Sequence, residues 1–333
     1  MNKLLLSVAA LMACTLSASA VEDNTVEIIF NGTTATVNMA SNISSYVTVE
    51  SGTSSHVRIK QDASFAGVDK SISNEDGEII YSLSGTSTDG EFYMEGSFKC
   101  TVELNGVTLT NPSGPALNIQ NGKRVNVRVE KGNTNTITDG ENADYNGCLH
   151  CKGHLKLRGK GTLNVVGNSK HGIYSKEYME VKNLTLNVTS AVKDALHCKE
   201  YFLMESGTVT LSGAGDDGIQ VELSSDPDTG ITPSHEDENS GNFYMTAGTL
   251  TISGYTGKAI KADGTITYTG GTQNFDTSDT EILTNISQLS NSQTTVAAAA
   301  VYDLNGRQLP QNVRPSKGLY LVKENGTIKK VLK

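Results

Sequence analysis

The chain has 333 residues with 33 glycines, 6 prolines and no tryptophan, and its 36 acidic residues outnumber 27 basic residues to give a net charge of −9. This acidic balance argues against a nucleic-acid-binding protein, because phosphate contacts need clustered Lys and Arg. Short runs of Val, Ile, Leu and Thr alternate with Gly, Asn, Asp and Ser. Such a pattern predicts an all-β protein with many short strands joined by turns.

The first 20 residues have the composition of a secretory signal peptide. A basic start ("MNK") precedes the apolar run "LLLSVAALMA", and small residues end at Ala20. We therefore expect cleavage after Ala20 and export of the remaining chain, in which no other apolar run is long enough for a transmembrane segment. Residues 21–77 are expected to form a β-rich cap, because Asn31-Gly32 between "TVEIIF" and "TATVNM" is a hairpin signal.

From Glu78 to Asp276 the sequence repeats a unit of three short strands. The first strands of five successive units read "CLHCK", "GIYSK", "ALHCK", "GIQVE" and "AIKAD", at spacings of 24, 23, 23 and 41 residues. A fixed period of this length is typical of solenoids, in which stacked turns bury one continuous apolar core. The sequence therefore predicts a right-handed parallel β-helix with an insertion in the 41-residue unit.

The alternation within each first strand divides its side chains between the core and the outer surface. We expect one inward column of apolar side chains, formed by Leu149, Ile173, Leu196, Ile219 and Ile260. Cys151 and Cys198 fall in the adjacent inward column two coils apart, which corresponds to roughly 9–10 Å and exceeds the reach of a disulfide. The cysteines are therefore expected to be buried and unpaired.

The outward side of the same strands repeats a pattern that suits a polymeric ligand. Its two columns are His150, Tyr174, His197 and Gln220, and beside them Lys152, Lys176 and Lys199. Adjacent coils would place the lysines roughly 5 Å apart, which is unfavourable unless Glu177 and Glu200 or a bound anion offsets the charge. Two interpretations stay open, a solvated face neutralised by those glutamates and a basic strip that follows the carboxylates of a uronic-acid polymer.

Carboxylates gather in the turn that precedes the first strand and in the insertion of the 41-residue unit. The insertion contains no Lys or Arg. Oxygen-rich loops without cations suit Ca²⁺, which takes about six to eight oxygen ligands. Turn-stabilising Asp residues and a solvated loop are the alternative explanations. The candidate calcium ligands are Asp194, Asp216, Asp217, Glu222, Asp226 and Asp228.

An ordered set of phrases in the repeat region gives a family resemblance. "LNGVTLTN", "GPAL", "NTITDG", "HGIYSK" and "GDDGIQ" follow one another between Glu78 and Asp276. In this order they resemble the bacterial calcium-binding, pectate-lyase-like β-helix proteins that bind carbohydrate. The resemblance implies non-catalytic, calcium-assisted binding of an acidic plant polysaccharide such as polygalacturonate.

Catalysis remains an alternative, because parallel β-helices also host pectate lyases and polygalacturonases. In this chain "HG" at His171 precedes "DD" at Asp216, whereas the order is reversed in the polygalacturonase pattern. A pectate lyase needs an Arg base near calcium, but Arg124, Arg128 and Arg158 all lie well before the Asp pair in the sequence. We therefore assign no catalytic residue, and a structural surface adhesin is the other alternative.

The end of the chain indicates where the protein works. Residues 277–300 are expected to form a linker, and residues 301–333 a small β segment. The stretches "DLNGR", "GLYLV" and "KKVLK" resemble the C-terminal sorting domain of type IX secretion cargo. This resemblance implies secretion or attachment at the outer membrane of a Gram-negative bacterium, with export and sorting machinery as partners.

Overall fold

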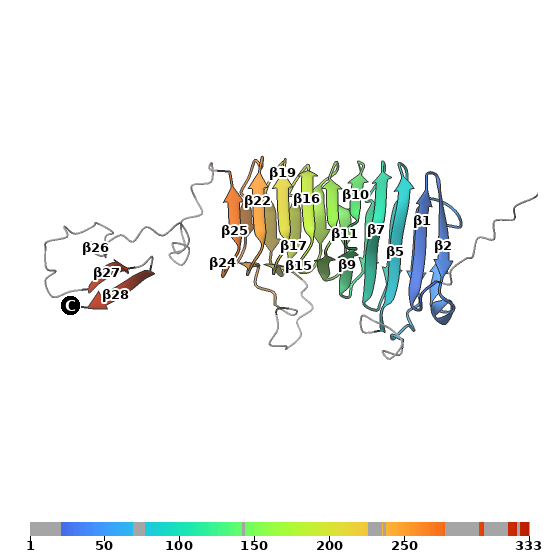
Figure 1. Ribbon diagram of the computed structural model, residues 1–333, viewed down its shortest axis with the longest axis horizontal. Coiled ribbons are helices and arrows are strands. Elements are labelled where there is room, and N and C mark those ends of the chain that lie inside the picture. Colours follow the sequence, from blue (N-terminus) through green and yellow to red (C-terminus); the bar gives the residue numbers. More distant parts are fainter. Residues whose placement is uncertain are drawn as a thin grey trace, which may run out of the picture. The chain divides into compact units, whose positions relative to one another are not determined.

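From residue 117 onward each coil of the structure contributes three short strands, and successive coils stack into a parallel β-helix (Figure 1). This computed structural model describes residues 21–68, 77–141, 144–225, 235 and 238–276, together with the backbone of three strands between residues 300 and 332. The chain divides into two units, Met1–Phe275 and Asp276–Lys333, and the first contains the β-helix. The prediction of an all-β chain folded as a parallel β-helix is therefore confirmed.

The first face of the β-helix is a nine-stranded sheet, parallel except where β3 pairs antiparallel with β4. Its outer surface carries the predicted ligand-binding columns. Its strands in chain order are β3 Val47–Val49, β4 His56–Gln61, β6 Glu91–Gly96, β8 Leu117–Asn121, β11 Gly147–Cys151, β14 His171–Ser175, β17 Leu196–Lys199, β20 Ile219–Glu222 and β23 Ile260–Ala262.

The other two faces belong to one sixteen-stranded sheet. They are continuous because the long strand β7 (Cys100–Asn111) pairs with β9 through its first half and with β10 through its second. The second face contains β9 Val125–Val129, β12 Leu155–Gly159, β15 Met179–Lys182, β18 Tyr201–Met204, β21 Asn242–Met245 and β24 Ile266–Tyr268. The third face contains β10 Thr134–Asp139, β13 Thr162–Val166, β16 Thr185–Ser190, β19 Thr208–Ser212, β22 Thr249–Ser253 and β25 Thr272–Phe275.

The N-terminal segment continues these sheets. β1 (Thr25–Asn31) pairs in parallel with β5 (Ile79–Ser87), and β4 pairs in parallel with β6. Parallel pairing thus starts upstream of Glu78. β2 (Thr34–Met39) and β3 pair antiparallel with β1 and β4 and lie at the ends of the two sheets, with the short 3₁₀ helix η1 (Ser41–Ile43) between them.

The core consists of the inward columns expected from the sequence. Parallel registers join Leu149 to Ile173, Ile173 to Leu196, Leu196 to Ile219 and Ile219 to Ile260. The first four of these side chains are fully buried and Ile260 is 5% exposed. The four described cysteines are buried and unpaired, in agreement with the expected absence of a disulfide.

The second unit contains a small antiparallel sheet of three strands, β26 Ala300–Tyr302, β27 Leu319–Glu324 and β28 Thr327–Leu332. The expected signal peptide, most of the expected linker and the "DLNGR" stretch lie outside the described residues. Within the described part of the chain, no helix has the length and apolar character needed to cross a membrane.

Candidate functional site

Three aromatic rings lie in register on the outer surface of the first face. Strand pairing aligns His150 with Tyr174 and Tyr174 with His197. The ring centroids are 5.2 and 5.3 Å apart, and the rings are inclined by 11° and 26°. We call these three residues the ring column. Because the rings stack on one another along the helix axis, they turn their edges to solvent, and Tyr174 and His197 are only 8% and 7% exposed. The ring column therefore offers polar ring edges rather than an open aromatic platform.

A second column, here called the lysine column, runs beside the rings and consists of Lys152, Lys176 and Lys199. Each lysine follows its ring residue by two positions, so both side chains project from the same surface of the same coil. Lys152 is exposed and the other two are partly exposed. The Lys199 Nζ atom lies 3.8 Å from Glu222 Oε2, whereas Lys152 and Lys176 form no ion pair with any described residue. The column thus presents accessible ammonium groups on an acidic protein.

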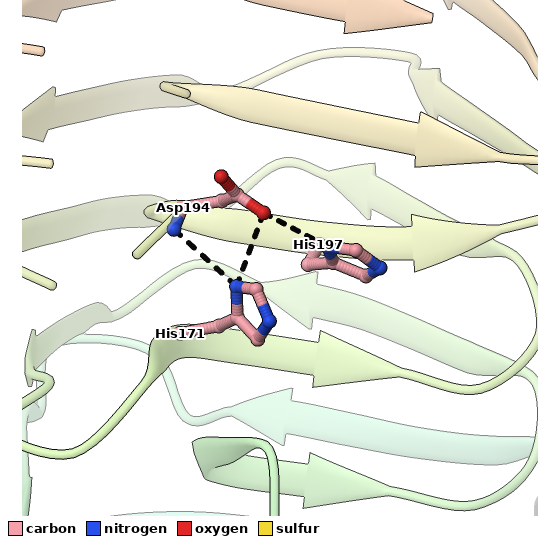
Figure 2. A group of neighbouring side chains, drawn as sticks. All are labelled: His171, Asp194 and His197. Atoms are coloured by element: carbon pink, nitrogen blue, oxygen red, sulfur yellow. Dashed lines mark hydrogen bonds and ion pairs between the residues drawn. The ribbon is translucent and has the colours of Figure 1, made fainter. Parts of the chain in front are cut away.

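The turn before these strands holds a carboxylate between two imidazoles (Figure 2). Asp194 Oδ2 lies 3.1 Å from His171 Nδ1 and 2.8 Å from His197 Nδ1. The Asp194 amide also lies 3.3 Å from His171 Nδ1 and donates to it in the tautomer that leaves this nitrogen unprotonated. Burial by itself would raise the pKa of Asp194, but the hydrogen bonds from His171 and His197 outweigh it and hold the pKa well below its usual value. Asp194 is therefore ionised throughout the physiological pH range.

Three of the predicted calcium ligands come together beside this group. Asp194, Asp216 and Asp217 each place a carboxylate oxygen within 4.8 Å of the others. The Asp217 amide donates to Asp194 Oδ1 at 3.0 Å, and Lys261 Nζ lies 3.4 Å from Asp217 Oδ2. Burial raises the pKa of Asp217. This arrangement supplies hard oxygen ligands of the type that Ca²⁺ prefers, next to one cationic side chain.

The other predicted ligands lie elsewhere. Glu222 Oε2 is 3.5 Å from His197 Nε2, and Gln220 Nε2 donates to Glu222 Oε1 at 2.6 Å. Glu222 and Gln220 therefore extend the ring and lysine columns rather than join the carboxylate group. Asp226 and Asp228 lie outside the described residues.

His171 has no predicted role from its sequence motif, although the strand register places it in a column with the predicted calcium ligands. Gly147 pairs with His171, and the same column continues through Asp194 and Asp217, each two positions before an inward residue of the next coil. This column of turn residues places His171 beside Asp194. Glu177 and Glu200, which one of the two open interpretations placed beside the lysines, gather with His154 at a corner of the coil.

The comparisons with known proteins fit this arrangement. Residues 66–312 match the family of carbohydrate-binding domain-containing proteins, and the chain belongs to this family. A solved structure, described as the polysaccharide lyase-like protein from C. thermocellum in a gadolinium derivative, superposes with a TM-score of 0.55 at 19% identity. The alignment covers 74% of this chain and 99% of that chain, which supports the shared fold. The comparison with curated proteins returned no match. The chain is thus a β-helical carbohydrate-binding protein.

Proposed function

We propose that the protein binds an acidic polysaccharide of the polygalacturonate type without cleaving it, and that the ring and lysine columns form the binding surface. The observation that carries this proposal is the register of Cys151, Ser175 and Cys198, because each of these residues directly precedes one member of the lysine column and so sets one lysine per coil. A polymer with one carboxylate in each sugar unit matches a surface that repeats one ammonium group in each coil.

Electrostatics support an anionic ligand for this surface. Neighbouring coils are about 4.8 Å apart, so successive ammonium groups repel one another when no anion is bound. Glu222 offsets this repulsion at Lys199. The ring edges and the Gln220 amide add neutral hydrogen-bonding groups for sugar hydroxyls, and such groups orient a carbohydrate while the charges attract it.

The binding surface can be tested by affinity electrophoresis in gels that contain polygalacturonate. We expect the Lys152→Ala/Lys176→Ala/Lys199→Ala variant to lose most of the retardation seen with the original chain, and we expect added salt to weaken the original interaction. Neutral glucans should retard neither protein. The control variant is Lys131→Ala/Lys160→Ala/Lys182→Ala, which removes three exposed lysines beside the turns that lead from the second face to the third. Equal retardation of the two triple variants would remove this surface from consideration.

We further propose that calcium assists binding through Asp194, Asp216 and Asp217, with Asp226 and Asp228 as additional ligands from the insertion. The close approach of three carboxylates supports this role, because a divalent cation would relieve their mutual repulsion. Calcium bound to the folded chain should raise the midpoint of thermal unfolding, and a chelator should reverse the shift. An unchanged midpoint, with no calcium in elemental analysis, would contradict this part of the proposal.

A second candidate function is cleavage of the same polymer. His197 supports it, because Asp194 holds its Nδ1 atom while its Nε2 atom lies 3.5 Å from Glu222. An imidazole oriented by a carboxylate is a common general base. Incubation of the protein with polygalacturonate and calcium separates the candidates, since only an enzyme releases unsaturated or reducing sugars.

We also propose that the protein works outside the cell or on its surface. The signal-peptide pattern of residues 1–20 and the sorting-domain resemblance of residues 301–333 support export through type IX secretion. Replacement of the C-terminal unit by an unrelated tag should leave the protein in the periplasm of a type IX-competent host. Cell fractionation and immunoblotting would detect this retention.

A further inference from the structure

A second group of ionisable side chains follows the lysine column along the chain, at the corner where the first face turns into the second. His154 precedes β12, Glu177 lies two positions before β15, and Glu200 precedes β18, so the three residues come from three successive coils. One ring nitrogen of His154 and one carboxylate oxygen from each glutamate lie within 4.8 Å of one another. Three potential metal ligands therefore converge at this corner.

These groups are well buried. Glu200 is 1% exposed, Glu177 is 7% exposed, and the His154 side chain is 12% exposed. Glu200 Oε2 is buried and has no hydrogen-bond partner among the described residues. Burial of a carboxylate oxygen without a partner is unfavourable, so a positive charge beside Glu200 would stabilise it.

The distance between His154 and Glu200 favours a metal ion as the source of this positive charge. His154 Nε2 lies 3.5 Å from Glu200 Oε2, and neither atom forms a hydrogen bond with any described group. A good hydrogen bond would be shorter, at about 2.7–3.2 Å. By contrast, two ligands held at about 2.1 Å from a tetrahedral zinc ion are separated by roughly 3.4 Å. The observed separation of 3.5 Å is longer than a hydrogen bond and close to the value expected for two ligands of one zinc ion.

The neighbouring histidine group shows the contrast. His171 Nδ1 and His197 Nδ1 approach Asp194 Oδ2 at 3.1 and 2.8 Å, which are ordinary hydrogen-bond distances. The Asp194 carboxylate therefore has partners at hydrogen-bond distance, although it also belongs to a group of potential metal ligands. His154 Nε2 and Glu200 Oε2 have no hydrogen-bond partner among the described residues.

We propose that His154, Glu177 and Glu200 bind a divalent transition-metal ion, with zinc as the best match, and that the ion clips three successive coils together. One imidazole and two carboxylates form a three-residue zinc site with a fourth position for water. The imidazole nitrogen separates this site from the all-oxygen surroundings that calcium prefers. The site shares no residue with the proposed polysaccharide surface or with the carboxylate group proposed for calcium.

The backbone at Glu200 provides a well-matched test variant. Glu200 has a φ of 62°, in the left-handed region that favours glycine, and Gly241 occupies the equivalent place in the next coil with a φ of 64°. A Glu200→Gly substitution therefore removes a ligand while it suits the local backbone. This variant should fold without metal, whereas Glu200→Gln keeps the shape of the side chain and removes its charge.

The experiment begins with the full mature chain after chelator treatment and gel filtration. Equilibrium dialysis against Zn²⁺ with elemental analysis should show one tightly bound zinc per chain, and zinc should raise the midpoint of thermal unfolding. Glu200→Gly and Glu200→Gln should weaken zinc binding by more than about 100-fold, because even changes outside the ligand shell cost about 10- to 100-fold. Replacement of zinc by Co²⁺ should give visible absorption bands that both variants lose.

The matched control is His171→Gln/His197→Gln, which removes two histidines but leaves the corner unchanged. It should retain zinc with the affinity of the original chain, and excess Ca²⁺ should not displace the ion. The proposal fails if the original chain takes up no zinc. It also fails if Glu200→Gly retains zinc, or if the control variant loses it.

Discussion

Asp194 shows how much of the site depends on a single residue. Its Oδ2 atom lies within hydrogen-bond distance of two imidazoles, and its Oδ1 atom accepts the Asp217 amide at 3.0 Å. Alternation in the sequence predicted the column in which His197 lies, but it could not predict which turn residues approach each other. The position of Glu222 could have been predicted from the sequence, because its register with Lys199 places it on the outer face. Its closeness to the insertion instead suggested that it belongs to the calcium group.

The partly buried position of His150 leads to a prediction of pH-dependent stability. Burial and the nearby Lys170 lower the pKa of His150 to about 4, whereas the unfolded chain titrates near about 6.5. As the pH falls from about 6.5 to about 4, the unfolded state takes up a proton before the folded state does. The stability that the neutral ring contributes above about 6.5 is therefore lost in this window, by at most about 3 kcal/mol.

A His150→Gln variant should lose less stability over this interval than the original chain does. Urea unfolding at several pH values measures the difference. Burial raises the pKa of Asp139 to about 6, so protonation of Asp139 stabilises the folded state as the pH falls, which is opposite to the effect of His150. Asp139 is present in both proteins, and the difference between their unfolding free energies therefore isolates the contribution of His150. Parallel curves for the two proteins would contradict the predicted role of His150.

At the scale of the strand, the fold could be predicted from two signals in the sequence. Apolar and polar residues alternate within each strand, and the same strand recurs at a fixed period, so both signals assign the same side chains to the core. Leu149, Leu196 and Ile219 occupy equivalent positions of three strands and are fully buried. The contacts of side chains at the corners of the coil could not be predicted, because the alternation of apolar and polar residues ends with the strand and does not specify the direction of a corner side chain. For this reason the sequence left open whether Glu177 and Glu200 neutralise the lysines, and it did not predict that they lie with His154.

A substitution in β17 tests the importance of the inward column. Leu196→Asp should prevent stable folding, because it buries a charge with no partner in an apolar stack. Leu196→Ala should lower the free energy of unfolding by about 2–5 kcal/mol through the cavity that it leaves. Thr208→Ala, at an exposed position of β19 in the same coil, should change it by less than about 0.5 kcal/mol. Urea unfolding of the three variants measures the effects, and similar losses for Leu196→Ala and Thr208→Ala would contradict the assignment.

At the scale of the molecule, a β-helix must protect the ends of its sheets. Exposed strand edges present unpaired amides and carbonyls, to which a second chain can add. At the N-terminal end β1 covers the long strand β5 and β4 covers β6, while β2 and β3 pair antiparallel outside them. At the other end β23, β24 and β25 have only three or four residues each. Short edge strands are a poor template for association, so the two ends are protected in different ways.

This difference predicts opposite outcomes for two deletions. A chain that starts at residue 77 exposes β5, nine residues long, and β6, six residues long, as free edges. It should therefore form dimers or larger aggregates, because both edges are long enough to pair with another copy. A chain that ends at residue 276 leaves all β-helix strand pairs intact and should remain monomeric if the mature chain is monomeric. Size-exclusion chromatography with light scattering measures both masses. A stable monomer after the N-terminal deletion would show that β1 to β4 are dispensable, because the exposed edges would then have to be protected by their own side chains.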